Sequence, residues 1–129
     1  MATPQETLSA YMHAFETLDP ARFLPFFNLP CLFISPAGTF AATDPASAGA
    51  IASQVVQQAR QQDYKRGEFS GQLESRVLGT GLVLLSGVVR RFNSKDQEVA
   101  RLACSYMLRD SGKEWKIVAV SLYPAPSNV

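Results

Sequence analysis

The chain has 129 residues, of which 47% are hydrophobic and 18% charged, so it can bury an ordinary core and is not generally disordered. Its net charge of +1, from 12 basic and 11 acidic side chains, argues against nucleic acid as a partner. Two cysteines and one histidine are too few for a disulfide framework or a zinc site. The longest apolar run, residues 81–89, is too short to span a bilayer, and the first residues lack the pattern of a signal peptide. We therefore expect one domain over residues 1–129, located in the cytoplasm, with no membrane or nucleic-acid partner, metal or cofactor.

Two helices are predicted before the first strand. Thr3 is suited to cap the first helix and Pro4 to occupy its first turn. Apolar residues then recur every three or four positions, as on one face of a helix: Leu8, Tyr11, Met12, Phe15 and Leu18. His13 falls on the opposite face of this helix. A second, very apolar helix is predicted over Ala21–Phe27, shortened or kinked by Pro25.

Two short strands and a long helix are predicted next. The strands cover Cys31–Ser35 and Thr39–Ala42, with a proline-glycine turn between them. Asp44 and Pro45 provide an N-cap and a first-turn proline for the third helix. This helix has the most regular apolar stripe of the chain: Ala48, Ile51, Ala52, Val55, Val56 and Ala59.

Long strands are predicted for the rest of the chain, after a polar loop over residues 62–67. They cover Ser70–Leu78, Leu82–Phe92, Glu98–Arg109 and Trp115–Tyr123, and a loose tail follows over residues 124–129. Helices followed by strands predict the α+β class, with a curved, mostly antiparallel sheet wrapped around three helices of the N-terminal half.

Alternation within the strands predicts which side chains face the helices. We expect Leu102, Cys104 and Tyr106 to point inward. Arg90 shares its parity with Leu82 and Leu84, which predicts a guanidinium at the mouth of the enclosed space. The last strand is expected to place five residues on one side: Trp115, Ile117, Ala119, Ser121 and Tyr123. The outward faces are then expected to carry apolar residues that need a cover: Val83, Leu85, Val89, Val118, Val120 and Leu122.

The chain resembles the nuclear transport factor 2-like superfamily from about Glu6 to Tyr123. The resemblance rests on a first helix bearing Tyr11, an Asp-Pro pair, an apolar helix, a strand ending in Ser-Pro-Ala-Gly (residues 35–38), a long helix, and a closing Gly-Lys-Glu-Trp-Lys-Ile strand (residues 112–117). It implies a cystatin-like α+β cone with an internal pocket, the scaffold of SnoaL-like cyclases and ketosteroid isomerases, and homodimers through the outer sheet face. This scaffold hosts many chemistries, and the chain is most similar to an uncharacterised branch.

The ketosteroid isomerase branch provides a test for catalysis. The resemblance places Tyr11 at its oxyanion tyrosine, Ser35 at the position of its base and Cys104 near its second carboxyl. Two of the three groups are therefore missing. The sequence shows no complete catalytic constellation and does not decide whether the protein is an enzyme.

We expect nine residues to line the pocket: Tyr11, Phe15, Phe33, Ser35, Arg90, Cys104, Tyr106, Trp115 and Ser121. Tyr11 and Ser35 would anchor a small apolar or weakly anionic molecule, and Arg90 would meet its charge. Each hydroxyl could instead satisfy a backbone group, and Arg90 could simply reach solvent. The interpretation is a small-molecule-binding domain. The alternatives are an isomerase, cyclase or hydrolase that uses the same pocket, and a dimeric protein-interaction module with a filled core.

Overall fold

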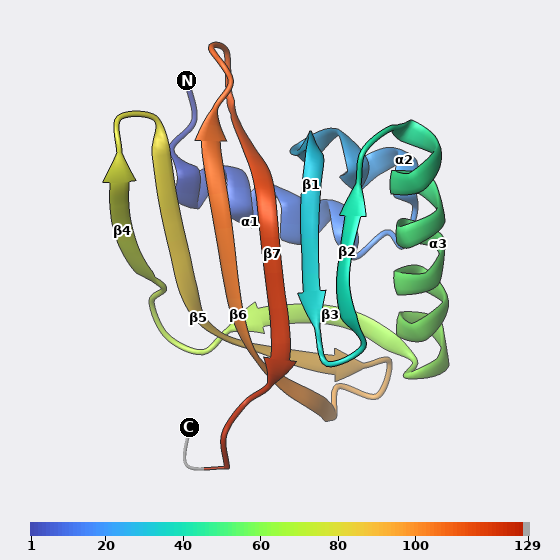
Figure 1. Ribbon diagram of the computed structural model, residues 1–129. Helices are drawn as coiled ribbons and strands as arrows, with labels where there is room; N and C mark the ends of the chain where they lie inside the picture. Colours follow the sequence, from blue (N-terminus) through green and yellow to red (C-terminus); the bar gives the residue numbers. More distant parts are fainter. Residues whose placement is uncertain (128–129) are drawn as a thin grey trace.

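The computed structural model describes residues 1–127 and has a seven-stranded sheet with helices on one side (Figure 1). The helices are α1 (Pro4–Phe15), α2 (Pro20–Phe23), the short 3-10 helix η1 (Leu24–Phe26) and α3 (Pro45–Gln61). The strands are β1 (Phe27–Ser35), β2 (Gly38–Ala42), β3 (Tyr64–Phe69), β4 (Glu74–Gly79), β5 (Leu82–Asn93), β6 (Glu98–Asp110) and β7 (Trp115–Pro124). The sheet order is β2-β1-β7-β6-β5-β3, with β4 also paired to β5. The β1–β7 pair is parallel and the others are antiparallel, which confirms the predicted α+β class.

Side-chain caps define where α1 and α3 begin. The backbone N–H of Thr3 donates to Glu6 Oε1 at 2.8 Å, and the N–H of Glu6 donates to Thr3 Oγ1 at 3.1 Å. The N–H of Ser47 donates to Asp44 Oδ1 at 2.8 Å at the start of α3. These bonds satisfy N–H groups that have no partner within the helix.

The helix predicted over residues 21–27 is wrong in its second half. Only Pro20–Phe23 is α-helical, because Pro25 cannot continue the helical hydrogen-bond pattern and a 3-10 turn follows. Phe27 already belongs to β1, four residues before the predicted start of that strand.

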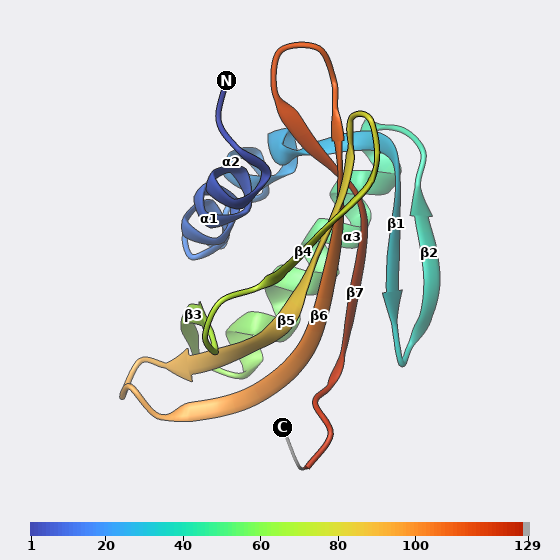
Figure 2. The same cartoon turned by 90° about the vertical axis from the view of Figure 1, so that its left-hand side faces the viewer.

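The sheet bends where two short strands share one edge of β5. β4 pairs with residues 82–86 of β5, and β3 pairs with residues 89–93. Leu73, between β3 and β4, packs over Gly87, where a Cβ would lie 2.6 Å from Leu73 Cδ2. Figure 2 shows the sheet from its edge, with β5 and β6 curling toward the helical side. The predicted polar loop and the single strand over residues 70–78 are therefore corrected to β3, a short connection and β4.

The predicted inward faces of β5 are also wrong. Val83, Leu85 and Val89 are buried in the core. Leu85 pairs with Tyr106 and Val89 pairs with Leu102, and directly opposite residues in antiparallel strands share a face. Since the expectation that Leu102, Cys104 and Tyr106 point inward is confirmed, their partners on β5 must point inward too.

A β-bulge divides the faces of β7. Leu108 pairs with Ile117, whereas Met107 pairs with Ala119, so Val118 is an extra residue on this strand. Ile117 and Val120 are therefore both buried. The prediction that Trp115, Ile117, Ala119, Ser121 and Tyr123 share one side is wrong beyond the bulge, and Val120 and Leu122 face the helices instead.

The core lies between the concave face and the helices. Leu8, Leu85, Leu108 and Ile117 are fully buried there. Ala125, in the predicted tail, donates its N–H to the carbonyl of Arg101 at 3.0 Å, and residues 128–129 lie outside the described part of the chain. Within residues 1–127, no helix combines the length and apolar content needed to cross a membrane.

Candidate functional site

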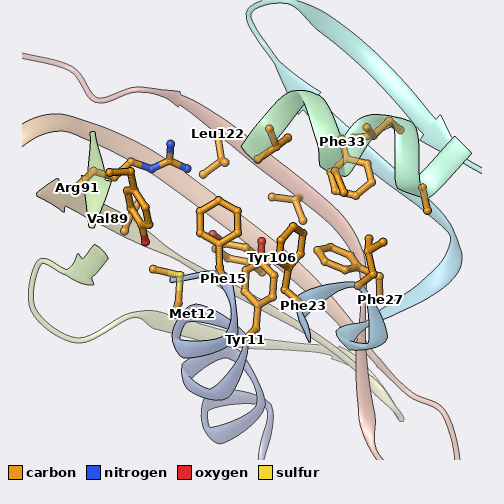
Figure 3. A pocket seen from close by; sticks show the side chains of 17 residues that line it. Tyr11, Met12, Phe15, Phe23, Phe27, Phe33, Val89, Arg91, Tyr106 and Leu122 are labelled. Atoms are coloured by element: carbon orange, nitrogen blue, oxygen red, sulfur yellow. The ribbon is translucent and has the colours of Figure 1, made fainter. Parts of the chain in front are cut away.

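A cavity of about 60 Å³ lies between α1, α3 and the concave face of the sheet (Figure 3). Its walls are almost entirely apolar or aromatic and come from every layer of the fold: Tyr11, Met12, Phe15, Phe23, Leu24, Phe27, Phe33, Ala48, Ile51, Ala52, Val55, Tyr64, Val89, Arg91, Tyr106, Val120 and Leu122. On the same measure one water needs about 10–15 Å³, so the cavity has room for a few waters or a small organic group.

Aromatic rings fill most of the space beside the cavity, and Tyr11 is at their centre. Its ring centroid lies 5.3 Å from that of Phe27 and 6.2 Å from that of Tyr106, both in edge-on arrangements. Phe15, one turn further along α1, packs against Tyr64 with the centroids 5.4 Å apart. Such edge-on pairs stabilise one another and hold the rings in fixed positions.

Three tyrosine hydroxyls at the cavity have no hydrogen-bond partner among residues 1–127. Tyr11, Tyr64 and Tyr106 line the cavity, and within residues 1–127 none of their hydroxyls is hydrogen-bonded. In this part of the chain, every side-chain oxygen or nitrogen that solvent cannot reach has a hydrogen-bond partner. The three hydroxyls lack a partner, so a small probe can reach them. Buried hydroxyls are normally satisfied, so these three are available to a bound molecule. Figure 3 shows the Tyr11 hydroxyl pointing into the cavity from α1.

Burial makes these hydroxyls donors rather than bases. Loss of water raises the pKa of Tyr64 to about 12, although the charge of Arg91 opposes this shift. Burial also raises the pKa values of Tyr11 and Tyr106 well above their ordinary range. All three phenols are therefore protonated at neutral pH and can donate hydrogen bonds to a ligand.

Arg91 provides the cation of the cavity. Its guanidinium carbon lies 5.5 Å from the centroid of Tyr64 and 5.9 Å from that of Phe15. It makes no hydrogen bond or ion pair with any residue of the described chain. Figure 3 shows the side chain reaching over the cavity from β5. A half-buried arginine whose contacts are rings alone retains its capacity to bind an anion.

Gly67 allows close packing next to Arg91. It is the direct partner of Arg91 across the β3–β5 pair, so the two residues share the concave face. A Cβ on Gly67 would lie 2.9 Å from Met12 Cε and 3.3 Å from the Tyr64 hydroxyl oxygen. Glycine at this position therefore allows the close approach of Met12 and Tyr64, two residues that line the cavity.

Four of the nine residues expected at the pocket line the cavity: Tyr11, Phe15, Phe33 and Tyr106. Two more are near it. Cys104 is buried on the same face as Tyr106, with its Sγ donating to the carbonyl of Gly87 at 3.5 Å, and Trp115 packs against the core. Burial raises the pKa of the Cys104 thiol to about 11, so it is no nucleophile at neutral pH.

Three expected residues lie elsewhere. The Ser35 hydroxyl accepts a hydrogen bond from the Ala37 N–H at 3.2 Å, within the turn after β1. Arg90 lies on the convex face, with its Nε 2.5 Å from Glu98 Oε1. Ser121 faces the convex side because of the β7 bulge, and its Oγ is 2.5 Å from Ser105 Oγ.

Sequence reasoning missed Arg91, Tyr64 and the wall formed by α3. Val89 was expected to face outward, Arg91 was not considered for the cavity, and Tyr64 fell in the predicted polar loop. No periodic signal marks Arg91 as inward; the β5–β6 register does, because the inward position of Tyr106 determines the inward residues of β5. The apolar stripe of α3 did indicate a buried face, and four of its residues line the cavity: Ala48, Ile51, Ala52 and Val55.

The cavity walls contain cationic and hydroxyl groups but no carboxylate or imidazole. General acid–base catalysis needs a titratable group that can accept a proton near neutral pH, and the walls do not provide one. His13 is 81% exposed, with Nδ1 3.6 Å from Glu16 Oε1, on the outer side of α1. Within residues 1–127, no cluster of three or more His, Cys, Asp or Glu side chains could hold a metal ion.

The bent sheet, the helices on its concave side and the enclosed cavity define the nuclear transport factor 2-like cone. The family described as "NTF2-like protein (DUF6841)" matches residues 4–125, and the chain belongs to this family. No curated protein matches the chain significantly.

Solved structures with low sequence identity share this fold. A protein of unknown function with a cystatin-like fold from Nostoc punctiforme has a TM-score of 0.74 and 11% identity, covering 95% of this chain and 89% of that one. A nuclear transport factor 2-like superfamily protein from Salmonella enterica has a TM-score of 0.69 and 16% identity, covering 96% and 90%. A candidate ketosteroid isomerase from Parabacteroides distasonis has a TM-score of 0.66 and 13% identity, covering 99% and 92%. At these identities the likeness establishes the fold alone.

Proposed function

We propose that the protein is a binding domain for a small organic molecule, which occupies the cavity on the concave face. The observation that carries this proposal is a set of three hydroxyls, from Tyr11, Tyr64 and Tyr106, that have no hydrogen-bond partner in residues 1–127. The rest of the cavity wall is apolar except for Arg91. Apolar walls with a few convergent polar groups are typical of ligand sites. A filled core would gain nothing from phenols without partners, since phenylalanine would pack equally well there.

The size of the cavity restricts the ligand. Its volume of about 60 Å³ is well below the roughly 300–1,000 Å³ of sites for drug-sized molecules. The ligand is therefore a small molecule, or a small part of one that displaces the flexible Met12 side chain. Met12 also lines a second, more open depression together with His13 and Gly67, so its movement would connect the cavity to the surface.

An enzyme on the same scaffold is the weaker interpretation. An isomerase of the ketosteroid type needs a carboxylate base, and Ser35 lies in a turn rather than at the cavity. A hydrolase or cyclase acting through hydroxyls would need a proton acceptor, which the walls do not contain. Tyr11 and Arg91 can donate hydrogen bonds to a bound molecule but cannot accept a proton from it, so they favour binding over catalysis.

Native mass spectrometry of the purified protein tests the binding function. We expect a fraction of the protein to retain a small molecule, which gentle activation releases. Val55→Phe adds apolar volume at the cavity wall and should abolish the retained mass, whereas Val77→Phe, at a position 73% exposed on β4, should not. Both variants must show the circular dichroism spectrum of the folded protein. A retained molecule unaffected by Val55→Phe would place the site elsewhere.

We also propose that the protein forms a homodimer through the convex face of the sheet. Small and apolar residues from four strands share this face: Leu32, Ile34, Leu84, Ser86, Val88, Ala103, Ser105, Met107, Ala119 and Ser121. Leu32 is 44% exposed. Charged side chains on this face lie toward the ends of β5 and β6, at Arg90, Arg101 and Arg109, and on the edge strand β4, where Glu74 and Arg76 pair with Ser86 and Leu84. The small and apolar area between these charges favours burial against a second copy. A cytoplasmic location is part of the proposal, because Cys31 and Cys104 are free thiols, as is usual in a reducing compartment.

A further inference from the structure

The charge balance of the cavity restricts the chemistry of its ligand. Arg91 is the one charged residue among the residues that line it. Its guanidinium faces two aromatic rings, at 5.5 and 5.9 Å, and has no carboxylate partner in residues 1–127. Rings offset only part of the desolvation that an arginine suffers away from water. The cavity wall therefore carries a positive charge that no carboxylate of residues 1–127 balances.

Neighbouring arginines on the same sheet are compensated. Arg90 contacts Glu98 and Glu68, with N–O distances of 2.5 and 3.3 Å. Arg66 contacts Asp96 and Glu68, with N–O distances of 2.7 and 2.8 Å. Arg91 differs from both because it lines the cavity and has no carboxylate partner in residues 1–127.

From this contrast we infer that the ligand of the cavity is a small monocarboxylate, bound by the Arg91 guanidinium between Phe15 and Tyr64. This inference rests on the proposed binding function. A single cation matches a single negative charge, and the planar guanidinium can donate two parallel hydrogen bonds to a carboxylate. Gly67 is opposite Arg91 on the concave face, and the Met12 methyl group and the Tyr64 hydroxyl pack closely against it. Tyr64 lies beside this position and can donate a further hydrogen bond, and the apolar walls contact the rest of the acid.

Matched pairs of charged and neutral probes separate this inference from the proposed function. Propionate and propionamide, and benzoate and benzamide, have nearly the same shape and differ in charge. Calorimetric titration of the wild-type protein should give binding of at least one of the two carboxylates, with its amide weaker by at least about tenfold. Arg91→Met should weaken that carboxylate by a similar factor and remove the difference between acid and amide.

Two further variants keep the test decisive if Arg91→Met does not fold. Arg91→Lys retains the charge but not the paired donors, and should bind the carboxylate with an intermediate affinity. Arg90→Met is the control, because its guanidinium lies on the convex face, and it should bind like the wild type.

Three outcomes would overturn the inference. Equal binding of acid and amide that Val55→Phe abolishes would remove the anionic preference and leave the binding function intact. A loss of carboxylate binding in Arg90→Met that Arg91→Met does not share would move the anion site to the convex face. An absence of binding for all four probes, together with no retained mass in the native spectrum, would reject both the inference and the proposed function.

Discussion

Arg90 and Arg91 are consecutive residues of β5, and their guanidinium groups lie on opposite faces of the sheet. Arg90 Nε is 2.5 Å from Glu98 Oε1 on the convex side, whereas the guanidinium carbon of Arg91 is 5.5 Å from the Tyr64 ring on the concave side. Side chains alternate between the two faces along a strand. If the faces of β5 are assigned one residue out of register, Arg90 is placed in the cavity and Arg91 in the surface ion pair, instead of the reverse. The chemistry proposed for this protein depends on that one-residue difference.

Tyr106→Phe tests whether the free hydroxyls serve a ligand. The Tyr106 hydroxyl has no partner within the described chain, so its removal should change the free energy of unfolding by less than about 0.5 kcal/mol. Affinity for the retained molecule should fall by about threefold to tenfold. Denaturant titration and calorimetry measure the two effects. Tyr123→Phe is the control, because the Tyr123 hydroxyl donates to the carbonyl of Ser35 at 3.2 Å, outside the cavity, and affinity should not change. Equal losses of affinity in both variants would show that Tyr106 has no special part in binding.

Gly87→Ala tests the account of the bend in the sheet. A Cβ at this position would lie 2.6 Å from Leu73 Cδ2, so the Leu73 side chain must leave its present position over β5. We expect the free energy of unfolding to fall by about 1–3 kcal/mol in a urea titration. Gly49→Ala is the matched change, because a Cβ at Gly49 within α3 meets no atom within 4 Å. It should raise the free energy of unfolding by about 0.5–1 kcal/mol, through the higher helix propensity of alanine. A neutral Gly87→Ala would mean that Leu73 does not hold the bend.

Alkaline pH should destabilise the protein, because burial raises the pKa of its two cysteine thiols. The pKa of Cys104 is raised from 9.0 to about 11, and that of Cys31 from 9.0 to about 12. Above pH 9 the unfolded chain therefore binds fewer protons than the folded chain, and the free energy of unfolding falls as pH rises. Urea titrations at a series of pH values should show this decline between pH 9 and 11, with a shallower slope in Cys104→Ala. A free energy of unfolding that stays level or increases in this range would contradict the raised thiol pKa values.

Ser105→Arg tests the homodimer. Ser105 lies near the middle of the convex face, where its Oγ is 2.5 Å from Ser121 Oγ. A buried, unpaired charge at this position should convert the dimer to a monomer in sedimentation velocity, without loss of secondary structure. Val77→Arg, on the exposed edge strand β4, should remain dimeric. If the wild-type protein is monomeric at the highest accessible concentration, the convex face has another function.

Much of the fold could be predicted from local sequence, because the signals are local. The cap at Asp44 and the apolar stripe predicted α3, and the strands predicted over Leu82–Phe92 and Glu98–Arg109 match β5 and β6 to within one residue. β3 was missed because its charged residues, such as Lys65 and Glu68, resemble those of a loop, and its partner is a distant part of β5.

The inward face of β6 was predicted correctly, but the faces of β5 and of β7 beyond its bulge could not be predicted in the same way. They depend on the pairing register and on the extra residue Val118 in β7, neither of which leaves a periodic signal. Tyr11, Phe15, Phe33 and Tyr106 were correctly expected to line the cavity. Arg91 was not expected there, because its face depends on the register of β5. Tyr11 and Phe15 belong to a helical stripe, whereas the position of Arg91 requires knowledge of its partner Gly67.

The most direct test of the central claim, that a small molecule binds inside the cone, is a methyl NMR titration of the wild-type protein with the four acid and amide probes. Binding in the cavity should shift the methyl signals of Ile51, Val89, Val120 and Leu122, which line it, and leave those of Leu84 and Val88 on the convex face in place. Shifts confined to the convex methyl groups, or none at saturating concentrations of every probe, would contradict the account.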